Sequence, residues 1–173
     1  MSESPIFLLS GPPGAGKSSV ATALMQHFER GIHIPMDDIR EWVVSGISHP
    51  SAGWSDETER QFKLARTVGA SAATLYADAG FAVALADVLS PPDVAAHFTD
   101  PRNRKTLLLP TLDTALERNA TRTNKTFNTL GLTELIRRVY GWLQQQDWSG
   151  WTILDSTNLT LEETVDAILE RTR

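Results

Sequence analysis

The eight residues from position 11 to 18 constrain this chain more than any other feature. They read Gly-Pro-Pro-Gly-Ala-Gly-Lys-Ser, a complete G-x-x-x-x-G-K-S phosphate-binding loop. A short apolar run at residues 6–10 precedes the loop and predicts a buried strand, and the pattern of residues 18–28 predicts a helix. This strand–loop–helix setting is the context in which the motif binds a nucleoside triphosphate together with Mg²⁺.

The residue types of the loop suit contact with phosphate. Glycine lets backbone N–H groups approach a polyphosphate closely, and the following helix adds unpaired N–H groups and the positive end of its dipole. Lys17 is expected to reach the β- and γ-phosphates and Ser18 to bind Mg²⁺, with Ser19 as a helper at most. The residues expected to hold ATP are therefore Gly11, Pro12, Pro13, Gly14, Ala15, Gly16, Lys17, Ser18 and Ser19.

Five short and continuous apolar runs predict the strands of a parallel sheet. They lie at residues 6–10, 31–35, 81–86, 106–109 and 151–154. Continuous runs, as opposed to alternating ones, are typical of strands that are covered on both faces. Helical patterns lie between these runs, so the order of elements predicts an α/β fold with helices on both faces of the sheet.

The longest helical pattern has an apolar stripe at Phe62, Ala65, Val68, Ala72, Leu75 and Ala79. Asp56 with Glu59 resembles its capped start, and Gly80 is placed as its stop. Other helices are expected around Leu116, at residues 132–146 and at residues 161–169.

Composition narrows the functional classes. The 173 residues suit one domain, and the net charge of −5 argues against a nucleic-acid partner. With no cysteine, the chain has no disulfide, no cysteine-ligated zinc and no thiol catalysis, and it fits the cytoplasm. No stretch predicts a signal peptide or a membrane span.

Two adjacent carboxylates, Asp37 and Asp38, follow the second predicted strand, and Arg40 stands close behind them. Ligands of open α/β sheets bind beyond the carboxyl ends of strands, where a carboxylate can accept the proton of an attacking hydroxyl. Alternation along the strand favours Asp37 as the base and Asp38 as a cap of the next helix. Alternatively, both carboxylates cap a turn. For Arg40 there are two interpretations: it pairs with an anionic substrate, or it lies on the surface of a helix.

Asp87 ends the third apolar run. At this position beside a phosphate loop, a carboxylate holds Mg²⁺, usually through water, or holds a hydroxyl of the substrate. The alternatives are a solvated strand end or a cap before Ser90.

Arg118 and Arg122 lie four residues apart and share one helix face. Such guanidiniums can stabilise the moving phosphoryl group or stack on a base, although a solvated helix surface is the alternative. Thr157, in the segment 155–158, lines the base pocket or caps the final helix. Trp42 and Trp54 could cover a substrate.

These motifs together resemble the small P-loop kinases, a branch that holds the chloramphenicol phosphotransferase-like, gluconate kinase-like, shikimate kinase-like and zeta-toxin-like proteins. The resemblance implies a single domain over residues 1–173 with a five-stranded parallel sheet in the order 2-3-1-4-5, forming a three-layer α/β/α sandwich. It also implies a substrate-binding insertion at about residues 39–60 and a lid at about 118–131. Asp37 is then the usual base, Arg118 packs on adenine, and Arg122 contacts phosphate. Ala86-Asp87-Val88 stands where shikimate kinases carry a Gly-Gly pair.

The resulting expectation is an ATP- and Mg²⁺-dependent kinase that acts on a hydroxyl of a small molecule such as a sugar, an antibiotic or a nucleotide-sugar, as a monomer or a homodimer. One alternative is a nucleoside or nucleic-acid 5′-hydroxyl kinase, and another is an ATP-binding module without catalysis. A GTPase would need Asn-Lys-x-Asp, and the Asn-Lys at residues 124–125 leads to Phe127.

Overall fold

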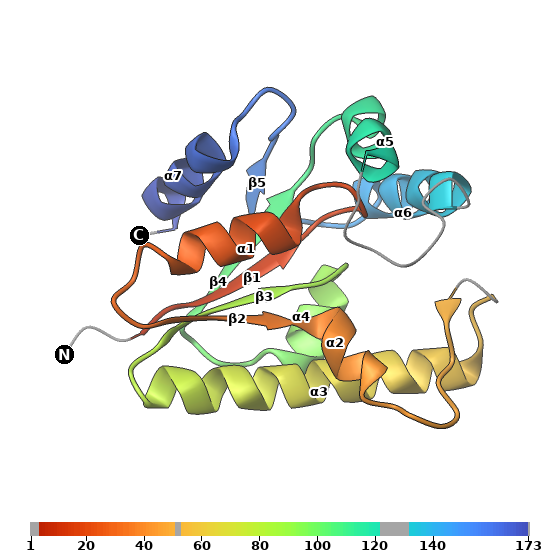
Figure 1. The fold of residues 1–173 in the computed structure, drawn as a ribbon, viewed down its shortest axis with the longest axis horizontal. Helices are drawn as coiled ribbons and strands as arrows, with labels where there is room; N and C mark the ends of the chain where they lie inside the picture. Colours follow the sequence, from red (N-terminus) through yellow and green to blue (C-terminus); the bar gives the residue numbers. More distant parts are fainter. Residues whose placement is uncertain (1–3, 51–52, 122–131, 173) are drawn as a thin grey trace.

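The computed structural model describes residues 4–50, 53–121 and 132–172. Its strands form one parallel sheet in the order β2-β3-β1-β4-β5 (Figure 1). The strands are β1 (Ile6–Ser10), β2 (Gly31–Pro35), β3 (Ala82–Ala86), β4 (Asn103–Leu108) and β5 (Thr152–Leu154). The predicted strand order and the three-layer α/β/α sandwich are confirmed.

Helices cover both faces of the sheet, as Figure 1 shows. They are α1 (Lys17–Met25), α2 (Met36–Glu41), α3 (Asp56–Asp78), α4 (Pro91–His97), α5 (Leu112–Ala120), α6 (Thr133–Gln144) and α7 (Leu161–Arg171). No helix in the described part of the chain is both long and apolar enough to cross a membrane.

Alternate residues of β1 feed two separate hydrophobic cores. Phe7 and Leu9 belong to the core under α1 and α7, whereas Ile6 and Leu8 belong to the core under α2, α3 and α4. All four side chains are almost completely buried. The continuous apolar run therefore reflects a strand that is covered on both faces.

Helix α3 differs in detail from the predicted pattern. Its N-terminal cap is Ser55, which forms a capping box with Thr58, and not the predicted pair of Asp56 and Glu59. The hydroxyl of Thr58 replaces the carboxylate that the usual capping box supplies. Leu75, predicted in the apolar stripe, is 70% exposed, because the buried face of the helix runs through smaller residues such as Ala73 and Ala77.

One helix begins earlier than predicted, and another was not predicted. Helix α2 begins directly after β2, with Pro35 as its N-cap and Asp37 and Asp38 in its first turn, so the prediction that Asp38 caps this helix is wrong. Helix α4 begins with Ser90 as its cap and prolines in its first turn. Proline is compatible with the first turn of a helix because the N–H groups there lack an intrahelical partner.

The parallel register brings the predicted functional residues to one edge of the sheet. Pro35 pairs with Ala86, and Ala86 pairs with Leu9, so β2, β3 and β1 end side by side. Ser10 then fixes the segment after β3, since its hydroxyl donates to the carbonyl of Leu89 over 2.6 Å and accepts from the Leu89 N–H over 3.0 Å.

Gly14 offers a test of how tightly the phosphate loop packs on α5. A Cβ atom added at Gly14 would lie 2.1 Å from the backbone oxygen of Ala115, whereas one added at Gly16 would meet nothing within 4 Å. Both glycines have φ of +86°, so an alanine would cause the same backbone strain at either position. We expect Gly14→Ala to be less stable than Gly16→Ala by about 2 kcal/mol in urea unfolding, because α5 must move. Equal stabilities would contradict this close packing.

Candidate active site

A cleft of about 1140 Å³ opens at the carboxyl ends of the strands. Its walls come from the phosphate loop, α2, the segment before α3, α3 itself, the end of β3, and α6. Among the predicted site residues, those that line it are Pro13, Gly14, Gly16, Lys17, Ser18, Asp37, Arg40 and Asp87. The structure therefore brings the phosphate loop, the acidic residue after β2 and the acidic residue after β3 into one cavity.

The phosphate loop has the backbone that a polyphosphate requires. Gly11, Gly14 and Gly16 have positive φ angles, and Gly16 is the N-cap of α1. A Cβ atom at Gly11 would lie 2.3 Å from the carbonyl oxygen of Leu108, so only glycine fits there. The ammonium group of Lys17 donates to the carbonyls of Gly11 and Pro12, over 2.8 and 3.0 Å. The loop is thus closed around its lysine and suits an anion at the start of α1.

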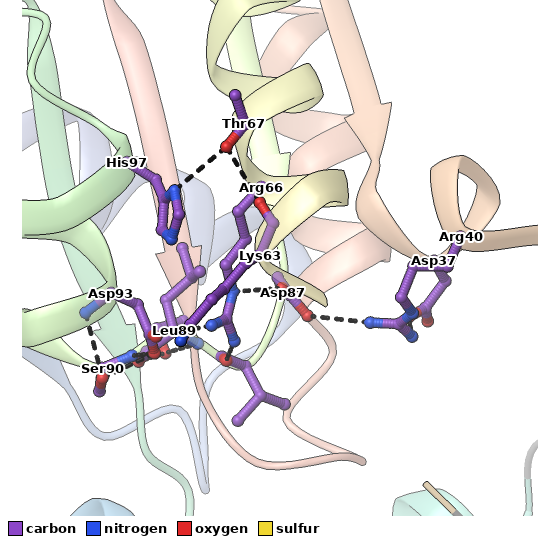
Figure 2. A network of polar contacts seen from close by, with 12 residues as sticks. Asp37, Arg40, Lys63, Arg66, Thr67, Asp87, Leu89, Ser90, Asp93 and His97 are labelled. Carbon is purple, nitrogen blue, oxygen red and sulfur yellow. Dashed lines mark hydrogen bonds and ion pairs between the residues drawn. The ribbon is translucent and has the colours of Figure 1, made fainter. Parts of the chain in front are cut away.

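Asp87 lies at the centre of a buried ionic network, which Figure 2 shows in close-up. Its carboxylate is 3.5 Å from Nε of Arg66 and 3.8 Å from a terminal nitrogen of Arg40. Burial raises the pKa of the Asp87 carboxyl, and the guanidiniums of Arg66 and Arg40 oppose that rise. The Asp87 side chain is only 6% exposed and Ser90 caps α4, so Asp87 is neither a solvated strand end nor a helix cap.

Arg66 of α3 connects this network to α4 and to the segment after β3. Its guanidinium donates to Asp93 over 2.6 Å and to the carbonyl of Val88 over 3.2 Å, and only 7% of its side chain is exposed. Asp93 in turn accepts from both the N–H and the hydroxyl of Ser90 at the start of α4. Arg66 thereby joins α3, the segment after β3, and α4 (Figure 2).

Removing this buried guanidinium should destabilise the fold. We expect Arg66→Ala to lower the free energy of unfolding by about 3 kcal/mol, because Asp87 and Asp93 lose a buried cationic partner. For a domain of this size that corresponds to a fall in Tm of about 6–12 °C. Arg60→Ala is the matched control on the same helix: Arg60 is 68% exposed and pairs with Glu57 at the surface, so its loss should hardly change Tm. Equal melting shifts for the two variants would refute the structural role of Arg66.

Asp37 and Asp38 differ clearly in their surroundings. The Asp37 carboxylate lines the cleft and forms an ion pair with Arg40, whereas Asp38 is exposed and lies outside the lining. The alternation used to prefer Asp37 does not apply, since β2 ends at Pro35 and Asp37 lies on a helix. Asp37 faces the cleft because of its position in the first turn of α2, close to the end of β3.

Arg118 and Thr157 lie together, but not in this cleft. The guanidinium of Arg118 donates to the carbonyls of Ser156 and Thr157, over 2.9 and 3.4 Å. The Thr157 hydroxyl accepts from the N–H of Thr111 and donates to Asp155. These contacts join α5 to the segment before α7. Arg122 and the predicted lid beyond residue 121 lie outside the described residues.

The sequence patterns did not single out Phe62 and Arg66 as residues of the cleft. Phe62 carries the Arg40 guanidinium 3.9 Å above its ring and contacts the Trp54 ring at a centroid distance of 4.8 Å. Trp54 also donates from its indole N–H to Glu59 over 2.9 Å. Arg66 gave no signal, because a single arginine in a long helix is most often a surface residue. Trp54, proposed to cover a substrate, lines the cleft, whereas Trp42 does not.

Comparison with known families gives one match. The family model described as Zeta toxin matches residues 2–105, which include the phosphate loop, Asp37 and Asp87. No curated protein sequence matches the chain.

Solved structures of the same fold resemble nearly the whole chain. The tunicamycin resistance protein of Deinococcus radiodurans is 16% identical with a TM-score of 0.66, and the match covers 97% of this chain and 95% of that one. A shikimate kinase from Bacteroides thetaiotaomicron is also 16% identical with a TM-score of 0.66, covering 96% and 97%. A gluconokinase from Sinorhizobium meliloti is 17% identical with a TM-score of 0.64, covering 99% and 94%. At these identities the likeness establishes the fold.

Proposed function

The chain belongs to the Zeta toxin family, and from this premise we propose that it transfers the γ-phosphate of ATP to a hydroxyl group of a small molecule. The observation that carries the proposal is the shared cleft, in which Lys17 and Ser18 of the phosphate loop and Asp37 line the same cavity. Solved structures with this fold include a shikimate kinase and a gluconokinase, which supports the same reaction class.

In this proposal the phosphate loop holds ATP. The N–H groups at the start of α1 bind the phosphates, and Lys17 turns from the loop carbonyls to the β- and γ-phosphates. Arg118 and Thr157 bind the base, and Arg122 is proposed as a further phosphate contact.

Mg²⁺ would be held by the Ser18 hydroxyl and, through water, by Asp87, with phosphate oxygens completing its shell. It would neutralise charge on the β- and γ-phosphates. Within the described ranges, no group of three or more His, Asp or Glu side chains could hold a metal alone, which fits a metal that arrives with the nucleotide.

Asp37 is proposed to accept the proton of the acceptor hydroxyl. The acceptor oxygen forms a bond to the γ-phosphorus, the bond from the γ-phosphorus to the bridging oxygen breaks, and ADP leaves with that oxygen. Arg40 holds the Asp37 carboxylate in place through their ion pair, and Asp87 holds Arg40 from the other side. The end of β3 thereby positions the base on α2.

The acceptor is proposed to bind between α2 and α3, in the insertion predicted at residues 39–60. Ile47, His49 and Trp54 of this segment line the cleft. The cytoplasmic location, and a monomeric or homodimeric state, remain predictions from the sequence.

The experiment that tests this function measures ADP release from ATP and Mg²⁺ in the presence of hydroxylated compounds. The panel contains sugars, cyclitols, aromatic alcohols, antibiotics, nucleosides and 5′-hydroxyl oligonucleotides. We expect at least one small hydroxylated compound to stimulate release well above the rate with water alone. ATP binding without stimulation by any compound would instead support a nucleotide-binding module, and stimulation by oligonucleotides alone would support a nucleic-acid kinase.

A further inference from the structure

The cleft has two apolar walls that remain partly exposed among the residues that the structure describes. One wall is the Trp54 ring, which is 57% exposed although Phe62 packs against it and Glu59 accepts its N–H. An indole that is fixed and yet exposed offers a preformed stacking surface, because little conformational entropy is lost when a ligand packs on it.

The second wall is an apolar stripe on α6. Leu135, Val139 and Trp142 follow one another at helical spacing, line the cleft, and continue the line of Leu132 just before the helix. The neighbouring side of α6 packs into the core, since Ile136 and Leu143 are completely buried. Trp142 remains 40% exposed. Helix α6 therefore presents one apolar stripe to the core and another to the cleft.

The charged groups near Asp37 disfavour the binding of an acidic ligand. Arg40 is paired with Asp37 and Asp87, and Arg66 is paired with Asp87 and Asp93. Glu41 and Glu59 add further carboxylates to the lining. An anion placed beside Asp37 would thus meet like charge, and both neighbouring guanidiniums are already engaged.

Arg138 of α6 is the remaining guanidinium in the described lining of the cleft. It lies on the helix wall and not in the ionic network around Asp87. Among the described guanidiniums of the lining, an anionic acceptor would therefore depend on Arg138, which makes this residue a diagnostic position.

From these walls and charges we propose that the acceptor is an uncharged alcohol with an aromatic or similarly apolar group, which packs between the Trp54 ring and the α6 stripe. The proposal rests on the kinase function proposed above and specifies the acceptor class. The same cavity is also lined by Lys17, Ser18 and Asp37, so in this proposal a hydroxyl on such a molecule reaches the base while its apolar part occupies the two walls.

The test measures binding of three probes to the full chain by ligand-observed NMR, without any turnover. Naphthylmethanol is an uncharged aromatic alcohol, naphthoate is its anionic counterpart, and inositol is an uncharged polyol without an apolar group. We expect naphthylmethanol to bind with a Kd in the low-millimolar range, typical of a compound of its size. Naphthoate and inositol should bind at least about tenfold more weakly.

Substitutions locate the binding. Trp54→Ala and Trp142→Ala should each weaken naphthylmethanol binding by about tenfold, and Trp54→Phe should restore most of it. Trp42→Ala is the matched control, since Trp42 is 68% exposed and lies outside the cleft lining, and it should change nothing.

Three results would overturn the proposal. One is that naphthylmethanol does not bind, or that Trp42→Ala weakens its binding as much as Trp54→Ala and Trp142→Ala do. Another is tighter binding of naphthoate that Arg138→Ala removes, which would indicate an anionic acceptor. The third is dissociation of a dimer by Trp142→Ala in sedimentation, which would show that a second copy covers α6. Binding of naphthylmethanol as expected, with no ADP release for any compound, would reject the kinase function alone.

Discussion

Lys17→Ala is expected to reduce phosphoryl transfer by about three orders of magnitude and to weaken ATP binding, while the fold remains intact. The reason is that Lys17 supplies the positive charge for the β- and γ-phosphates, where negative charge shifts during transfer. Steady-state ADP release with a stimulating acceptor measures the effect, and ATP affinity is measured separately by calorimetry.

Lys63→Ala provides the control for this variant. Lys63 is 58% exposed on α3, pairs with Glu59 and does not line the cleft, so its removal takes away one positive charge without touching the loop. Its turnover should stay close to that of the unmodified protein. If Lys17→Ala and Lys63→Ala behaved alike, the phosphate loop would not be the ATP site.

Asp37→Asn is expected to lower turnover by about two to four orders of magnitude, because a neutral amide cannot accept the proton of the acceptor hydroxyl. ATP affinity should change little, since Asp37 is proposed to contact the acceptor. Stability should also change little, because the pair of Asp37 and Arg40 is partly exposed.

The neighbouring residue supplies the matched control. Asp38 lies on the same turn of α2 but is exposed and outside the cleft lining, so Asp38→Asn should retain turnover. A large loss in Asp38→Asn together with normal turnover in Asp37→Asn would show that the base has been assigned to the wrong carboxylate. KM for the acceptor and kcat should be determined separately for both variants.

Much of the fold could be predicted because its signals are local. The apolar run of β1 feeds both cores, and the phosphate-loop motif determines the strand before it and the helix after it. The first half of β4 carried no such signal, because Asn103, Arg104 and Lys105 are polar and become strand residues through pairing with β1. Helix α4 was not predicted because two prolines follow the Ser90 cap and form its first turn.

In the candidate site, too, some residues could be predicted from the sequence and others could not. Asp37 and Asp87 could be singled out because residues after parallel strands meet at one edge of the sheet. Arg66 could not, since its partners lie on α4 and after β3 and become neighbours only when α3 packs on the sheet. The two apolar walls of the cleft likewise depend on how α6 and Trp54 come to line one cavity, which no short sequence motif records.

Tracing the γ-phosphate tests the central claim most directly. The full-length protein is incubated with Mg²⁺, ATP labelled in its γ-phosphate and the acceptor that most strongly stimulates ADP release, and the label is separated into inorganic phosphate and organic phosphate ester. We predict one labelled phosphate ester for each ADP formed, with no ester in Lys17→Ala. Label recovered only as inorganic phosphate would contradict the account, because the protein would then hydrolyse ATP without transferring its phosphate to an alcohol.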